Sequence, residues 1–147
     1  MALDLGAIRT QLAEDLRSGL ERSNLNVTAL LPDRPMILPH VMVVPATNYV
    51  DYQQAFSKGL GTVELEIRCY APMTESGQVL LDEMLSAGTD QPNSVIDALA
   101  SARLLAGRPW ADLVVRTAQF GGRVALGDEN TPAYVVALAV TVIVPRS

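Results

Sequence analysis

The sequence predicts a single α+β domain, in which a mostly antiparallel sheet of four to five strands carries helices packed on one face. Three observations indicate this class: residues 62–71 alternate strictly between apolar and polar, residues 4–23 repeat apolar side chains at helical spacing, and residues 134–144 are apolar on both faces of a strand. With 147 residues and no repeat, the chain is long enough to bury one core without disulfides or metals.

The predicted strand over residues 62–71 separates two kinds of side chain. One face carries Val63, Leu65, Ile67, Cys69 and Ala71, and the other carries Thr62, Glu64, Glu66, Arg68 and Tyr70. Because successive side chains of a strand point to opposite faces, this pattern is typical of a half-buried strand. We therefore expect its charged face to meet water or another subunit.

Residues 48–61 are expected to form a long loop before this strand. The loop carries aromatic side chains that no local periodicity can bury, and it holds the one lysine among eleven basic residues. Exposed aromatic side chains beside a rigid strand favour an interaction surface over a reaction centre. The candidate interface residues are Tyr49, Asp51, Tyr52, Phe56 and Lys58 of the loop, and Glu64, Glu66 and Arg68 of the strand.

The first third of the chain is expected to form one helix and two strands. Apolar residues at three- and four-residue steps predict an amphipathic helix over residues 4–23, ended by the turn-prone pair Ser23-Asn24. A short apolar piece follows at residues 27–31. Residues 40–44 are predicted to form a buried strand, because prolines bracket it at positions 39 and 45.

Two helices and two strands are expected after Pro72. The first helix begins near residues 74–76 and ends at Gly88, with an apolar stripe of Val79, Leu80, Met84 and Leu85. The second begins at residue 93 or 94 and ends near Gly107. The strands are predicted at residues 112–119 and 134–144, with a turn at Gly121-Gly122.

The last predicted strand has one large and one small face. Val136, Leu138, Val140 and Val142 share the large face, whereas Ala137, Ala139 and Thr141 share the small one. A strand that is apolar on both faces belongs in the centre of a sheet. We expect helices to pack closely over its small side.

No constellation of residues predicts catalysis, a cofactor or a metal. The one histidine, His40, starts a buried strand without a serine or cysteine signature beside it, so a structural role is favoured. Glu64 and Glu66 lie about 7 Å apart on one strand face, but Arg68 and Thr62 beside them favour a solvated or intersubunit face. Cys69 has no disulfide partner and is expected to be an inert core thiol. The sequence therefore predicts a protein that is not an enzyme.

Charge and hydropathy narrow the possible partners. The net charge of −5 argues against wrapping a nucleic acid by charge attraction. The beginning of the sequence lacks the basic start and apolar run of a secretory signal. The longest apolar run, residues 133–144, is shorter than the roughly 20 residues that a membrane helix needs. We expect a soluble protein made in the cytoplasm.

The order of these features resembles the tail terminator proteins of long, non-contractile-tailed (siphovirus-type) bacteriophages, particularly those that infect actinobacteria. The resemblance covers nearly the whole chain. After the leading helix it consists of Leu31-Pro32-Asp33-Arg34, a strand ending in Val43-Val44-Pro45, the aromatic loop, the alternating strand, the helix with Ser76-Gly77-Gln78 and Leu81-Asp82, and the final apolar strand.

The resemblance implies a structural virion protein in the tail or neck, assembled in the host cytoplasm. Such a protein forms a homo-oligomeric ring, usually a hexamer, that caps the tail tube, ends its polymerisation and docks to the head-side connector or stopper. Its partners are its own copies, the major tail tube protein and the connector; DNA is met only in transit through the lumen, with no membrane and no cofactor. A related neck or tail-completion protein is the nearest alternative. A small ligand-binding or enzyme-accessory domain with a pocket at Glu64 and Glu66 is the alternative from another class.

Overall fold

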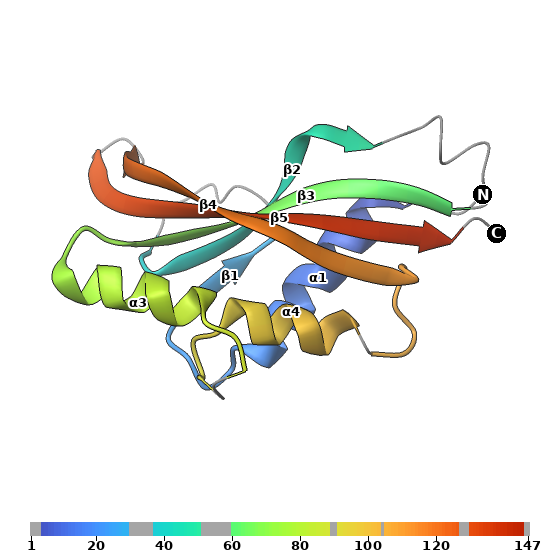
Figure 1. The fold of residues 1–147 in the computed structure, drawn as a ribbon, viewed down its shortest axis with the longest axis horizontal. Helices are drawn as coiled ribbons and strands as arrows, with labels where there is room; N and C mark the ends of the chain where they lie inside the picture. The colour runs from blue at the N-terminus through green and yellow to red at the C-terminus, as the bar shows by residue number, and fades with distance from the viewer. Residues whose placement is uncertain are drawn as a thin grey trace.

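The computed structural model describes residues 4–29, 37–50, 60–88, 91–103, 105–126 and 130–145, and they form an α+β fold (Figure 1). The elements follow in the order α1 (Leu5–Gly19), β1 (Asn26–Thr28), β2 (His40–Val50), β3 (Leu60–Pro72), α3 (Glu75–Leu85), α4 (Val95–Arg103), β4 (Asp112–Leu126) and β5 (Thr131–Pro145). Within the described residues this order, one helix, three strands, two helices and two strands, matches the predicted one.

The described strands form one mostly antiparallel sheet in the order β1-β2-β3-β5-β4. Only β1 and β2 run parallel; the pairs β2–β3, β3–β5 and β5–β4 are antiparallel. The register places Leu65 opposite Val140 and Ile67 opposite Leu138. The alternating strand β3 and the apolar final strand β5 are therefore both interior strands, and each is paired on both sides.

The core lies on the face of β3 that carries Val63, Leu65, Ile67 and Cys69, as the alternation predicts. On β5 the same face carries the large residues Val136, Leu138, Val140 and Val142. Helix α3 packs over this large face, where Leu81 and Val136 line one groove. The prediction that helices cover the small face of this strand is wrong, because the larger side chains bury more apolar area beneath the helix.

The helices are shorter than predicted, and their inner faces differ in part. Asp4 caps α1 by accepting a hydrogen bond from the Ala7 backbone N–H at 3.0 Å, and the helix ends at Gly19 rather than at residue 23. At Gly19 an added Cβ would lie 2.8 Å from the Ala98 Cβ, so a side chain there would separate α1 from α4. The inner face of α3 is Gly77, Leu81 and Met84. Val79, predicted in the buried stripe, is 57% exposed.

Two strands are longer than predicted. Strand β2 continues through Pro45 to Val50, with a register shift between these residues, so the segment between strands is residues 51–59 rather than 48–61. Strand β4 runs through Gly121-Gly122, which form a bulge and not a turn. Gly122 has a φ of 77°, a left-handed conformation that glycine adopts without strain.

Helix α1 covers part of one edge of the sheet. The Arg9 Nη2 donates to the Ala29 carbonyl at 2.8 Å, and the Arg17 Nε donates to the Val27 carbonyl at 3.1 Å. The Asn26 N–H bonds toward β2, so the carbonyls of Val27 and Ala29 alternate with the bonded groups and face outward. Among the described strands, β4 forms the opposite edge and has no strand on its outer side.

Candidate functional site

The polar face of the sheet carries a hydrogen-bonded chain across three strands. The Thr141 hydroxyl of β5 donates to the Glu64 Oε2 of β3 at 2.7 Å, and the Arg116 Nε of β4 donates to the Thr141 hydroxyl at 2.5 Å. Thr141 is only 3% exposed and lies opposite Glu64 in the register. The hydroxyl therefore links a carboxylate and a guanidinium that sit two strands apart.

The neighbouring charges on this face are also paired. The Arg68 Nη2 lies 3.2 Å from the Glu66 Oε2, and the two side chains are 42% and 29% exposed. The pKa of Arg68 is raised: burial opposes this shift, but hydrogen bonds and charge interactions with Tyr70 and Glu66 outweigh it. Glu64, Glu66 and Arg68 thus find partners within their own subunit, so this face carries less uncompensated charge than the sequence suggests.

The structure brings together only part of the predicted interface. Glu64, Glu66 and Arg68 share one face of β3. Tyr49 lies on β2, half-buried and packed against the hydrophobic core of its own subunit, and so is less available to a partner than a loop residue would be. Asp51, Tyr52, Phe56 and Lys58 lie outside the described residues. Their role stays a prediction.

A shallow hollow of about 350 Å³ lies on this face beside Glu66 and Arg68. Its floor and walls mix the polar groups of β3 with apolar residues of the β4–β5 hairpin; the lining includes Tyr70, Val124, Leu126, Val135 and Ala137. The hollow offers a carboxylate, a guanidinium and a phenol at one side of an apolar surface.

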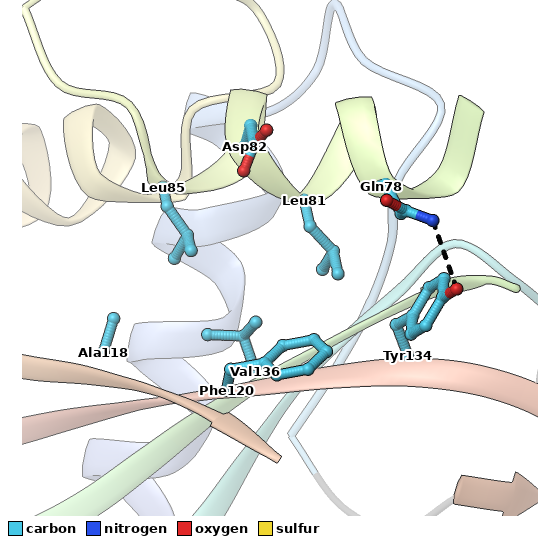
Figure 2. A pocket seen from close by; sticks show the side chains of 8 residues that line it. All are labelled: Gln78, Leu81, Asp82, Leu85, Ala118, Phe120, Tyr134 and Val136. Carbon is cyan, nitrogen blue, oxygen red and sulfur yellow. Dashed lines mark hydrogen bonds between the residues drawn. The ribbon is translucent and has the colours of Figure 1, made fainter. Parts of the chain in front are cut away.

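A second groove, of about 470 Å³, lies between α3 and the β4–β5 hairpin (Figure 2). In Figure 2, Phe120 and Val136 rise from the sheet toward Leu81 and Leu85 of the helix. The Phe120 and Tyr134 rings lie 6.1 Å apart, and the Gln78 amide donates to the Tyr134 hydroxyl at 3.2 Å. Phe120 is 63% exposed, so an apolar ring at this groove faces solvent.

Phe120 is not among the residues that the sequence predicts at a site. Its predicted strand ended at Gln119, one residue earlier, because the following glycine pair suggested a turn. An aromatic residue directly before Gly-Gly in an alternating strand is the available signal, since glycines inside strands mark bulges on exposed edges.

His40 and Cys69, two of the residues weighed for chemistry from the sequence, are both buried. His40 is 4% exposed, and its Nε2 lies 2.9 Å from the Thr28 hydroxyl of the parallel neighbour strand. Cys69 is fully buried, and burial raises the pKa of its thiol to about 12, which leaves no thiolate near neutral pH. Within the part of the chain that the structure describes, no cluster of histidine, cysteine or acidic residues could hold a metal ion.

The helices α1, α3 and α4, which are those of the described residues, are all too short or too polar to cross a membrane. No protein-family model matches the chain, and a search of curated proteins finds no match.

Proposed function

We propose that the chain is a structural phage protein that forms a homo-oligomeric ring of six copies, which caps the tail tube, ends its growth and joins it to the head-side connector. Its partners are further copies of itself, the major tail tube protein and a connector or stopper protein. The role is non-enzymatic, and DNA contacts the ring only in transit.

The observation that carries the proposal is the difference between the two edges of the sheet. Arg9 and Arg17 occupy two outward carbonyls at the β1 edge, whereas no strand of the described residues pairs with the outer side of β4 along its fifteen residues. An open strand edge favours association with another chain, and a closed one prevents uncontrolled sheet growth. A subunit with one open sheet edge and one edge with occupied carbonyls suits an assembly of limited size, such as a closed ring.

The surface charges support the same role. We take the described helices α1, α3 and α4 to pack on one face of the sheet, which leaves the face with Glu64 and Glu66 for other contacts. Glu66 pairs with Arg68, and Glu64 connects to Arg116 through Thr141. With a net charge of −5 the subunit offers few free cations to phosphate groups, whose contacts would slow passing DNA.

The test combines the purified chain with the major tail tube protein of the same phage. We expect the chain to be monomeric when dilute, to form rings when concentrated or at tube ends, and to shorten the tubes seen in electron micrographs. Long filaments of the chain alone would indicate a tube subunit instead. Unchanged tube lengths over a wide range of added chain would contradict a terminator role.

A ligand-binding domain is the second candidate, favoured by the hollow of about 350 Å³ beside Glu66, Arg68 and Tyr70. A small ligand with a carboxylate and an apolar body would match the guanidinium and the apolar walls. Thermal-shift screening of carboxylate ligands separates the two candidates. Stabilisation that Arg68→Gln abolishes would favour this domain over the ring.

A further inference from the structure

Two exposed apolar patches lie on different sides of α3. The first, the β4 patch, is Phe120, which is 63% exposed, together with the Tyr134 ring that lies 6.1 Å from it. The second, the α3 patch, is Val79 together with Leu80 and the two prolines Pro39 and Pro72, which line a groove of about 440 Å³. Exposed apolar side chains beside a groove mark interaction sites more often than scattered single ones do.

The two patches adjoin different faces of the same helix, α3. Phe120 lines a groove with Leu81 and Leu85, whereas Val79 lines the groove that faces Pro39 and Pro72. Because α3 separates them, one patch does not cover the other within a single copy. Two different patches are what a head-to-tail contact needs, whereas a two-fold dimer needs one self-complementary patch.

We propose that the Phe120 side chain of one copy inserts into the groove beside Val79 of the next copy, and that this contact repeats head to tail around the ring. The inference rests on the proposed ring. A cavity of about 150 Å³ holds a benzene molecule, so the groove has room for the phenyl ring. On the β2 side, Arg9 and Arg17 occupy the outward carbonyls of β1, which favours a side-chain contact over added strand pairing.

The charges around the patches are complementary. Arg123 follows Phe120 on β4, is exposed, and has no hydrogen bond or ion pair within the described residues. Glu75 and Glu83 flank Val79 one helical turn away on either side, and Glu83 lines the groove. Opposite charges at the rim of an interface steer the correct approach and disfavour wrong partners. The acidic residues at the rim of the α3 patch of one copy therefore favour contact with the β4 side of the next copy, which carries Arg123.

Cysteine crosslinking tests the contact directly. In the full chain, Phe120→Cys combined with Val79→Cys should give, on mild oxidation, a ladder of crosslinked species that extends beyond the dimer. Each single variant should stay uncrosslinked, and Cys69 is buried and so does not interfere. Dimers of Phe120→Cys alone would overturn the proposal in favour of β4 self-pairing. Rings from the double variant without any crosslinks would overturn the contact and leave the ring intact.

A charge exchange supplies an independent test. Arg123→Glu and Glu75→Arg should each weaken assembly, roughly two- to fivefold per contact in sedimentation experiments, and the double exchange should restore it. Leu105→Ser is the matched control, because Leu105 is 48% exposed outside both patches. Melting temperatures show that each variant is folded. Single variants that assemble like the wild type would overturn the contact; a wild-type chain that never assembles, even at tube ends, would overturn the proposed function as well.

Discussion

Arg108 and Asp15 form a two-pronged ion pair between residues 93 positions apart: the Arg108 Nε lies 2.7 Å from the Asp15 Oδ2, and the Nη2 lies 2.6 Å from the Asp15 Oδ1. The Asp15 side chain is only 5% exposed, and the Gln11 amide also donates to it at 3.0 Å. The pair joins α1 to the segment that leads from α4 into β4, so it fixes the leading helix against the second half of the chain.

Breaking this pair should destabilise the subunit. Arg108→Gln leaves the Asp15 carboxylate buried without its counter-charge, so we expect the melting temperature to fall by more than about 5 °C. The control is Arg103→Gln, which breaks the more exposed pair of Arg103 with Asp112. Equal melting temperatures of the two variants would show that the buried pair of Asp15 and Arg108 stabilises the subunit no more than the exposed pair of Arg103 and Asp112 does.

The apolar centre of the sheet should tolerate truncation poorly. Leu65 and Leu138 are at most 1% exposed, so changing either to Ala should lower the free energy of unfolding by roughly 2–5 kcal/mol. Val114→Ala, at a site 39% exposed on β4, should cost much less. Urea unfolding measures all three. A small loss at Leu65 would show that the core does not lie on this face of β3.

The polar face should affect assembly more than folding. Glu66→Lys removes an exposed pair with Arg68 and should change the free energy of unfolding by less than about 1 kcal/mol. It should nevertheless alter ring formation if this face meets a neighbour, because it places two cations side by side. Sedimentation and thermal melting of the same samples separate the two effects. Thr141→Val is the comparison that removes the buried hydroxyl between Glu64 and Arg116.

Stability should fall in mild acid because of His40. Burial lowers the pKa of His40 below its usual value of 6.5. Below about pH 6.5 the unfolded chain therefore takes up a proton that the folded chain resists, and the free energy of unfolding falls until the folded pKa is reached. Urea unfolding between pH 7.5 and 5 should show this loss.

His40→Gln supplies the comparison for this pH effect. The variant keeps a polar side chain near Thr28 but has no group that titrates in this range. It should therefore show a flatter dependence of the free energy of unfolding on pH. An equal slope in both proteins would assign the acid sensitivity to other groups.

Local periodicity correctly predicted the features of the fold that are set by residues close together in the sequence. The alternation of β3 placed Leu65 and Ile67 in the core and Glu64 on the opposite face, and the apolar final strand was correctly put in the interior of the sheet. These predictions succeeded because a strand with one buried face must alternate.

The features that form the candidate surfaces depend on contacts between residues far apart in the sequence, and local patterns do not reveal such contacts. Arg9 reaches carbonyls 20 and 34 residues away, and no local pattern indicates that it covers part of a sheet edge. The continuation of β4 past Gly121 depends on pairing with β5 and places Phe120 on an exposed strand. The predicted cover over the small face of β5 was wrong for a related reason: which face a helix covers is decided by packing across the whole sheet.

The length of tail tubes assembled with increasing amounts of the chain tests the central proposal most directly. A terminator should shorten the tubes in proportion to its concentration, with one ring visible at the capped end in electron micrographs. Tubes of unchanged length with no density at their ends, formed beside a folded and fully soluble chain, would contradict the account.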